Sequence, residues 1–298
     1  MRDLLGDLRS VAERSPGRIV VVDPDGTTTE ASELLARVEA RVTDLTNRLP
    51  RGSHVLLEGE GDVRFFAWAL ATLISGRVLV PANGAWPGVY QNQLLDELQA
   101  VDPQAVRVST LASPQGGTLR ADPRPPAGSD PALVLFTSGA SGRPKGVLHS
   151  HQGLHSAESE EDPATLWDPR TRALTNGDQP ALLRYTSPSS AVQVNHLVAI
   201  AAGWRVVCLQ PLQWIDPEVL ARTVRTHPIR KLLMTPSLCD ALLARTYGAE
   251  SGWAGPLEVL QLSGVAVTED VVGRLVDRLQ SELRLLDLYG QSEATRWL

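Results

Sequence analysis

Short apolar segments alternate with helical segments along most of the chain, and this alternation constrains the fold more than any other sequence feature. Strand-like segments occupy residues 53–59, 77–81, 105–110, 132–138, 181–187, 205–210, 229–235, 257–263 and 284–290. Helix-like segments separate many of them, at residues 62–76, 191–204, 217–227, 236–246 and 268–283. Short apolar strands joined by helices are typical of parallel sheets that are covered on both faces. We therefore predict an α/β fold with mostly parallel sheets flanked by helices.

The charge and the apolar runs exclude several functional classes. The 298 residues carry a formal net charge of -6, which does not favour a nucleic-acid partner. The most apolar run, residues 65–74, is shorter than the roughly 20 residues that a membrane span needs. The N-terminal segment lacks the apolar core of a signal peptide. We therefore expect a cytoplasmic protein with no membrane partner, in which Cys208 and Cys239 are buried free thiols.

A glycine-rich segment with one lysine directly follows the strand at residues 132–138. It combines three glycines, three hydroxyl residues and two cations: Gly139, Gly142, Gly146, Thr137, Ser138, Ser141, Arg143 and Lys145. Its spacing matches neither the Walker loop nor the dinucleotide fingerprint. Glycines let backbone N–H groups approach an anion, and ligands of parallel sheets bind beyond the carboxyl ends of the strands. The composition favours a nucleotide phosphate site, with a solvent-exposed hairpin loop as the alternative.

The segment LFTSGASGRPKGVLHSH, residues 135–151, resembles the phosphate loop of the adenylate-forming superfamily. That superfamily comprises acyl-CoA synthetases, the adenylation domains of nonribosomal peptide synthetases, and luciferases. The match has one departure, Ala140, where a hydroxyl residue is commoner. Residues 27–45, 65–87 and 285–295 resemble further blocks of the family in the same order, so the resemblance covers nearly the whole chain.

The resemblance implies roles for the residues that match its motifs. The loop residues Thr137, Ser138, Gly139, Ala140, Ser141, Gly142 and the catalytic Lys145 would hold the triphosphate of ATP. Tyr289 would stack on adenine, Ser292 would contact the α-phosphate, and Glu293 would hold Mg²⁺. Asp287 and Gly290 belong to the same nucleotide segment, and the adenine edge would lie along Gly264, Val265 and Ala266, which match the family pattern less well.

The implied reaction is the activation of a carboxylic acid. The acid attacks the α-phosphorus of ATP, pyrophosphate leaves, and an acyl-adenylate forms. The acyl group then passes to a thiol of coenzyme A or of the phosphopantetheine on a carrier protein, and AMP is released. The protein supplies alignment and charge neutralisation in this chemistry and needs no nucleophile of its own.

The acid pocket of the family lies after the strand at residues 181–187. Here the candidate lining residues are Tyr185, Ser189, Ser190, Asn195 and His196. Residues 182–197 contain no acidic side chain that could pair with a substrate ammonium, which argues against an ordinary α-amino acid. Two alternatives remain open: an amino-acid pocket with a different anchor, and a His196 that only satisfies the helix backbone.

The resemblance also predicts a division of the chain and further segments beyond it. We expect an AMP-binding N-terminal core with subdomains at residues 51–179 and at 1–50 with 180–298. Family members continue with a β-barrel portion and a small C-terminal domain, which carry an aspartate for the ribose and a catalytic lysine. The expected absence of this small domain has three explanations: a part of a longer enzyme, a half completed by a second chain, or a shortened homologue that binds a nucleotide or carrier. We expect Lys231 to be a surface charge.

Overall fold

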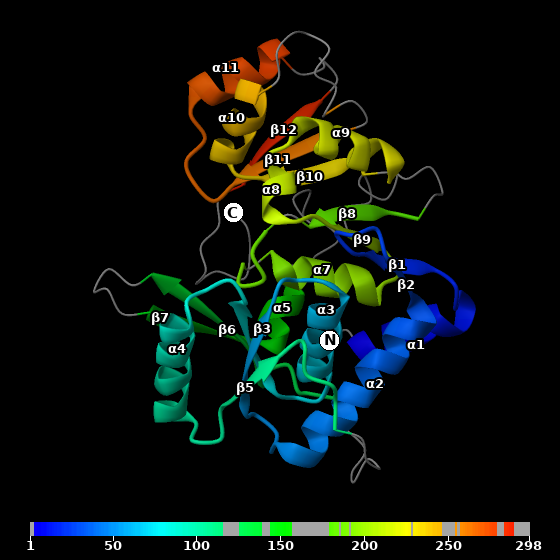
Figure 1. Ribbon diagram of the computed structural model, residues 1–298, viewed down its shortest axis with the longest axis vertical. Helices are drawn as coiled ribbons and strands as arrows, with labels where there is room; N and C mark the ends of the chain where they lie inside the picture. Colours follow the sequence, from blue (N-terminus) through cyan, green and yellow to red (C-terminus); the bar gives the residue numbers. More distant parts are fainter. Residues whose placement is uncertain are drawn as a thin grey trace. The chain divides into compact units, whose positions relative to one another are not determined.

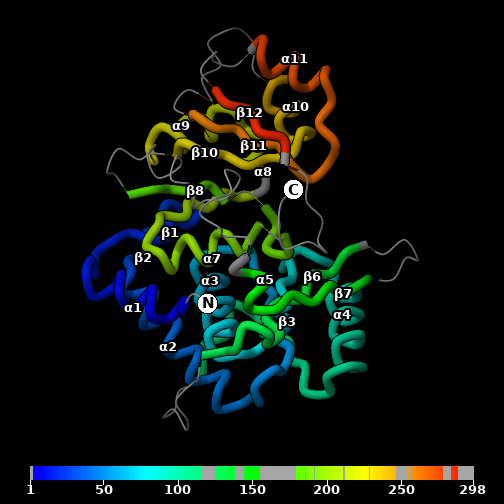
Figure 2. Tube along the Cα trace, turned by 180° about the vertical axis from the view of Figure 1, so that it is seen from behind, coloured from blue at the N-terminus to red at the C-terminus, as the bar shows by residue number. Residues whose placement is uncertain are grey.

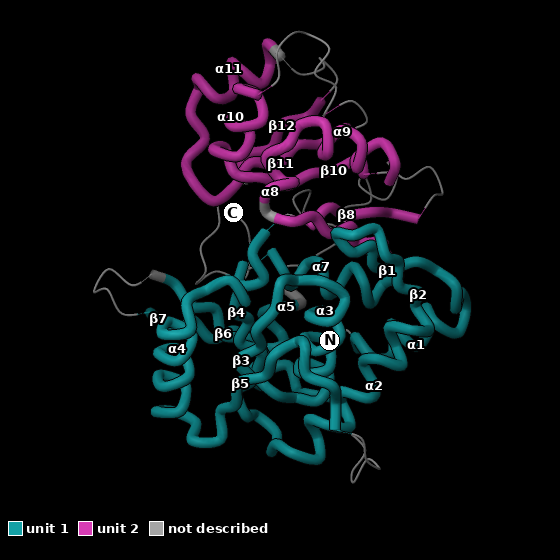
Figure 3. Tube along the Cα trace, viewed as in Figure 1, with its two compact units in different colours: residues 1–156, 186–203 teal, residues 157–185, 204–298 magenta. Residues whose placement is uncertain are grey.

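The computed structural model describes residues 3–115, 125–138, 144–156, 179–184, 186–190, 192–227, 229–245, 254, 257–278 and 283–288. The chain forms two compact units (Figure 3). Unit 1 comprises residues 1–156 and 186–203, and unit 2 comprises residues 157–185 and 204–298. The units group residues 1–50 differently from the subdomains predicted above, which were defined by sheets and stay a prediction. No helix among the described residues is both long and apolar enough to cross a membrane.

Unit 1 is built around a five-stranded sheet with the strand order β5-β3-β4-β6-β7. These strands are β3 (His54–Gly59), β4 (Val78–Asn83), β5 (Val106–Ser109), β6 (Pro131–Ser138) and β7 (Pro144–Ser150). The helices of this unit are α1 (Leu4–Arg14), α2 (Ala31–Arg48), α3 (Val63–Ile74), α4 (Gly88–Val101), α5 (His151–Ser156) and α7 (Gln193–Ala201). Outside the five-stranded sheet, an antiparallel hairpin joins β1 (Ile19–Val22) to β2 (Thr28–Glu30).

Helices cover both faces of this sheet, with α4 on one side and α3 on the other, and α2 packs against α3 (Figure 1). Nearly every residue of α3 is buried, which agrees with a segment that is apolar on all sides. Asp62 caps this helix by accepting a hydrogen bond from the backbone N–H of Phe65 at 3.0 Å. On the other face, Leu94 and Leu98 of α4 pack in one cluster with Leu56 of β3 and with Val78, Val80 and Ala82 of β4.

Unit 2 contains a parallel sheet in which β10 (Lys231–Met234), β11 (Val259–Ser263) and β12 (Arg284–Leu288) lie side by side (Figure 2). A second parallel pair joins β8 (Ala181–Arg184) to β9 (Arg205–Cys208). The helices are α8 (Pro211–Trp214), α9 (Pro217–Thr226), α10 (Pro236–Arg245) and α11 (Glu269–Arg278). Cys208 and Cys239 are buried and neither forms a disulfide, as predicted. Burial raises the pKa of the Cys239 thiol to about 12.

The predicted α/β class with mostly parallel sheets is confirmed, and two details of the prediction are wrong. First, Lys145 does not belong to a loop, because β7 begins at Pro144 and runs antiparallel to β6. Second, Lys231 is not a surface charge: the residue is only 5% exposed at the start of β10. An amine that is buried at this position is a structural group rather than a solvated one.

Candidate functional site

The β6–β7 hairpin carries the described part of the predicted phosphate site. β6 pairs with β4 in parallel at Leu133 and Leu79. β7 then returns along β6, so that Thr137 lies opposite Lys145 in the antiparallel ladder. Buried side chains anchor β6 from Ala132 to Leu135. The Thr137 hydroxyl donates to the Lys145 carbonyl oxygen at 3.4 Å, which joins the two strands where they leave the sheet.

Gly146 allows the two strands of the hairpin to pack closely. A Cβ atom at this position would lie 3.1 Å from Cγ1 of Val134, which is closer than most real Cβ contacts. The glycine directly follows Lys145 in β7. The hairpin therefore depends on glycine for its shape as well as for any approach of a ligand.

The Lys145 side chain is exposed at this end of the sheet. Within residues 3–138 and 144–288, wherever they are described, it has neither an ion pair nor a side-chain hydrogen bond. An exposed amine held by an antiparallel ladder can neutralise an anion without first leaving another partner. Gly139, Ala140, Ser141 and Gly142, and the side chain of Ser138, lie outside the described residues.

The carboxyl end of β4 lies beside that of β6. Four residues beyond the pair of Leu79 and Leu133, the two parallel strands reach Asn83 and Thr137. The side-chain Nδ2 of Asn83 donates to Oγ of Ser187 at 3.3 Å. The turn before α7 is thereby joined to the same end of the sheet as the β6–β7 hairpin.

Four of the five predicted pocket residues lie in this part of unit 1. Ser189, Ser190, Asn195 and His196 occupy the turn and the first part of α7, whereas Tyr185 lies outside the described residues. Ser189 Oγ lies 2.8 Å from Ser187 Oγ. His196 is only 4% exposed, and its Nδ1 lies 3.2 Å from Oε1 of Gln193.

Three polar residues at this edge were missed by the sequence analysis: Asn83, Ser187 and Gln193. The Gln193 side chain is buried, and its Nε2 has no hydrogen-bond partner in the described part of the chain. A buried amide donor without a protein partner is costly and fits a ligand or water. Asn83 could have been found, because it closely follows the predicted strand at residues 77–81; Gln193 looks like an ordinary helix residue.

The corresponding edge of unit 2 carries the predicted adenine segment. β11 and β12 end together, with Leu262 opposite Asp287 and Ser263 opposite Leu288. Gly264 then adopts φ +97°, and an added Cβ would lie 3.3 Å from Cγ2 of Thr235. Only glycine adopts this conformation readily, so the turn after β11 is specified by the sequence. Val265 and Ala266 are exposed, as is Asp287.

Ser263 lies at the end of β11, and its hydroxyl is buried with no partner among the residues that the structure describes. Tyr289, Gly290, Ser292 and Glu293, which hold the nucleotide in the predicted site, lie outside the described residues. The described residues also contain no group of three or more His, Cys, Asp or Glu side chains that could hold a metal ion. The predicted Mg²⁺ ligand, Glu293, therefore stays a prediction.

Comparison with known proteins identifies the family. The model of the AMP-binding enzyme family matches residues 87–298. The chain is 28% identical over 316 residues to phosphinothricin tripeptide synthetase PhsC of Streptomyces viridochromogenes, covering 99% of the chain and 27% of that protein. It is 28% identical over 330 residues to 4-chlorobenzoate–CoA ligase of an Arthrobacter species, covering 95% of the chain and 56% of that enzyme. The chain thus spans little more than half, or less, of the length of these relatives.

A solved structure supports the same fold. The N-terminal subdomain of Klebsiella oxytoca NpsA, in complex with 3-hydroxyanthranilyl-AMSN, matches with a TM-score of 0.77 at 20% sequence identity. The match covers 100% of this chain and 74% of the NpsA chain. Together with the family match over residues 87–298, it leads to one conclusion: the chain belongs to the AMP-binding enzymes of the adenylate-forming superfamily.

Proposed function

We propose that the chain binds ATP and a carboxylic acid and joins them as an acyl-adenylate with release of pyrophosphate. The observation that carries this proposal is the β6–β7 hairpin, where Thr137 and Lys145 lie opposite each other at the carboxyl edge of the sheet. Lys145 is exposed there and makes no ion pair within the described segments, so its charge is available to a phosphate.

In the proposed reaction, a carboxylate oxygen attacks the α-phosphorus of ATP and forms the acyl–phosphate bond. The bond from the α-phosphorus to the bridging oxygen breaks, and its electron pair leaves with pyrophosphate. Charge therefore accumulates on the β- and γ-phosphates, which Lys145 and the backbone donors of residues 137–146 would stabilise. Alignment of two anions supplies much of the remaining acceleration.

Mg²⁺ would neutralise part of the triphosphate charge when it is bound. The described hairpin offers donors and an amine, and it contains no carboxylate that could hold the ion. A cation site must therefore draw on other residues, and Glu293 remains the candidate that the resemblance supplies. Ser292 beside it is the proposed contact to the α-phosphate, and the turn from Gly264 to Ala266 is the proposed adenine edge.

The acid pocket is proposed to lie at the turn and first part of α7, next to Asn83. Its described side chains are hydroxyls, amides and an imidazole, with no carboxylate between residues 186 and 197. A pocket of this kind suits an acid without a buried ammonium, because an ammonium needs an anionic partner. Aryl acids are the first class to test, since one relative is a 4-chlorobenzoate–CoA ligase and NpsA was solved with a 3-hydroxyanthranilyl ligand.

The acceptor of the acyl group is proposed to be a thiol of coenzyme A or of a carrier-protein phosphopantetheine. One relative is named as a CoA ligase and another as a peptide synthetase, so both acceptors have a precedent. The remaining segments of the catalytic cycle would come from a longer protein or from a second chain. The alternative is a module that binds a nucleotide or carrier without turnover.

The test is substrate-dependent exchange of pyrophosphate into ATP by the 298-residue chain, over a panel of aryl, fatty and amino acids. We expect exchange above background with at least one aryl acid, and a fall of at least about tenfold in Lys145→Ala and in Glu293→Ala. Arg9→Ala is the matched control, because Arg9 is an exposed cation paired with Glu39 far from the hairpin in sequence.

Binding of acyl-sulfamoyl adenosines, measured by calorimetry, separates the two functions. In these probes a stable acyl sulfamate replaces the acyl phosphate. Tight binding without exchange would favour the nucleotide-binding module or a half that needs a second chain. A folded chain that neither exchanges nor binds any probe more tightly than AMP would contradict acid activation.

A further inference from the structure

Asn83 ends β4 with both of its side-chain polar atoms in use. Its Oδ1 accepts a hydrogen bond from the backbone N–H of Ala85 at 2.9 Å. Because a backbone N–H can only donate, this bond identifies the oxygen, and the amide nitrogen Nδ2 must face Ser187. Nδ2 donates to Ser187 Oγ at 3.3 Å. The backbone carbonyl of Asn83 accepts from Trp86 N and Gln91 Nε2, which holds the residue in place.

The partner of Asn83 belongs to the serine turn, residues 187–190, which leads into α7. Ser187 Oγ receives a second hydrogen bond, from the backbone N–H of Ser189 at 3.4 Å. It also lies 2.8 Å from Ser189 Oγ. The turn is closed by Ser190 N, which donates to the Ser187 carbonyl oxygen at 3.0 Å.

The number of donors and acceptors determines which atom donates in each hydrogen bond of the series from Asn83 through Ser187 to Ser189. A serine hydroxyl has two acceptor lone pairs and one proton. Asn83 Nδ2 and Ser189 N occupy both acceptor positions of Ser187, so Ser187 donates its proton to Ser189 Oγ. Ser189 then keeps its own proton to donate. Elsewhere in the described residues Ser189 Oγ has no other partner, so this donor is left for a ligand.

We propose that Asn83 is a positioning residue that makes Ser189 a hydrogen-bond donor to an acceptor atom on the bound acid. The inference rests on the proposed function and deepens it, because it names a property of the acid. An acyl group with an acceptor at the right place binds better than one without it. Asn83 acts through Ser187 and does not touch the acid.

Asn83→Asp is the most informative variant, because it preserves the shape of the side chain and reverses the direction of donation in this series of hydrogen bonds. A carboxylate can only accept, so Ser187 must donate to it. Ser187 then accepts the Ser189 proton, and Ser189 offers an acceptor instead of a donor. Asn92→Asp is the matched control: it changes the same amide to a carboxylate on α4, where Asn92 Oδ1 accepts from exposed Arg107 at 2.8 Å.

The probes are four sulfamoyl adenosines with acyl groups of the same shape: benzoyl, picolinoyl, nicotinoyl and isonicotinoyl. The last three place a ring nitrogen acceptor at successive positions of the benzoyl ring. We expect one of them to bind the native chain about three- to tenfold more tightly than the benzoyl probe, the worth of one hydrogen bond. That gain should vanish in Asn83→Asp and Ser189→Ala and persist in Asn92→Asp. Because all four probes carry the same charge, the ratio is insensitive to the added carboxylate.

Amide hydrogen exchange provides a readout that needs no ligand. Asn83→Ala and Ser187→Ala should each accelerate exchange at Ser189 and Ser190 about three- to tenfold. Ser187→Thr keeps the hydroxyl and should restore native exchange. The double variant should exchange no faster than Ser187→Ala alone, because Asn83 acts on the turn through its bond to Ser187.

Three results would overturn the proposal: no gain from any ring nitrogen, a gain that survives in Asn83→Asp, or unchanged exchange in Asn83→Ala. If the native chain binds none of the four probes more tightly than AMP, the aryl-acid form of the proposed function fails, and the proposal fails with it. Tight probe binding without an acceptor gain overturns the positioning role alone.

Discussion

The two ends of the five-stranded sheet in unit 1, where its parallel strands begin (the amino edge) and where they finish (the carboxyl edge), differ in whether polar groups are left without a described partner. At the amino edge, where β3, β4, β5 and β6 begin, charged residues are bound to partners within the protein. At the carboxyl edge, Lys145 is exposed without a described ion pair, and Ser189 keeps a proton to donate. The difference teaches that a charge near a strand end is informative about chemistry only when its partners are known.

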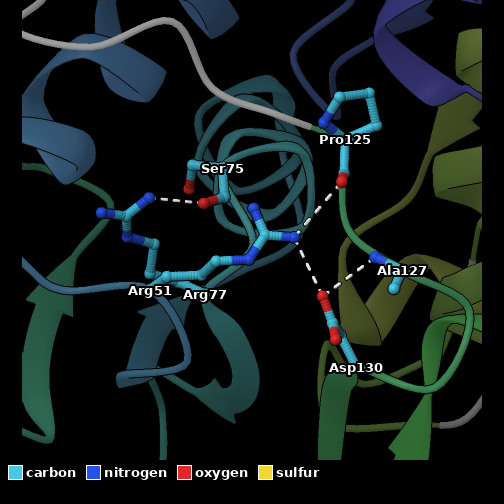
Figure 4. Close-up of polar contacts among 6 residues, drawn as sticks. All are labelled: Arg51, Ser75, Arg77, Pro125, Ala127 and Asp130. Carbon is cyan, nitrogen blue, oxygen red and sulfur yellow. Dashed lines mark hydrogen bonds and ion pairs between the residues drawn. The ribbon is translucent and has the colours of Figure 1, made fainter.

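Two arginines that precede strands form hydrogen bonds at the amino edge (Figure 4). Arg77, just before β4, is 5% exposed and donates to the carbonyl oxygen of Ser75. It also donates to the carbonyl oxygen of Leu49. Arg51, just before β3, donates to Asp130 Oδ2 at 2.9 Å and to the Pro125 carbonyl at 3.3 Å. Asp130 directly precedes β6, so this cluster fixes the start of the strand whose other end turns into β7.

The largest expected effect tests the structural character of the amino edge. Arg77→Ala removes the donor of two carbonyl groups and empties a buried volume, so the free energy of unfolding should fall by about 2–4 kcal/mol. The affinity for pyrophosphate, measured on the folded fraction, should stay within about twofold of native. Urea unfolding measures the change in stability, and calorimetry measures the affinity for pyrophosphate. Arg9→Ala, at an exposed pair, should change stability by less than about 0.5 kcal/mol. Weakened pyrophosphate binding would break the contrast between the edges.

The next effect concerns the carboxyl edge, where we expect a variant to change binding and leave stability unchanged. Lys145→Ala should weaken pyrophosphate binding by about ten- to a hundredfold, because a charged hydrogen bond is worth about 1.5–3 kcal/mol. The urea midpoint should stay native, since the amine has no described partner to lose. Lys145→Arg keeps a charge and should recover part of the affinity. An unfolding shift as large as that of Arg77→Ala would place Lys145 among the structural charges.

The smallest effect is a pH dependence at the amino edge. Burial raises the pKa of Asp102, but hydrogen bonds from the backbone and ring of His54 and from the backbone of Gln104 together lower it by more. The pKa of Asp102 therefore lies below the ordinary value of 3.8. A lowered folded pKa gives stability that is present above 3.8 and is lost as the pH falls through the folded value. Asp102→Asn should therefore flatten the acid limb of the stability curve without changing activity at pH 7. An unchanged acid limb would show that the pair contributes nothing.

The sequence predicted the elements that are defined by apolar pattern better than those defined by partners. The buried helix was predicted at residues 62–76 and runs from Val63 to Ile74. This prediction succeeded because an almost unbroken run of apolar residues indicates a buried helix. β7 was missed because its exposed residues, including Lys145 and Leu148, do not alternate like a half-buried strand. The role of Asn83 could not be predicted, since its partner Ser187 lies 104 residues away.

The central claim is that the carboxyl edge of this sheet, and not the amino edge, holds the triphosphate. Amide hydrogen exchange of the native chain with and without magnesium ATP tests both edges in one experiment. We predict slower exchange in peptides that contain Thr137 to Lys145, and unchanged exchange in peptides at residues 50–54 and 101–105, where β3 and β5 begin. Protection at the amino edge, or none at the β6–β7 hairpin when ATP is bound, would contradict the claim.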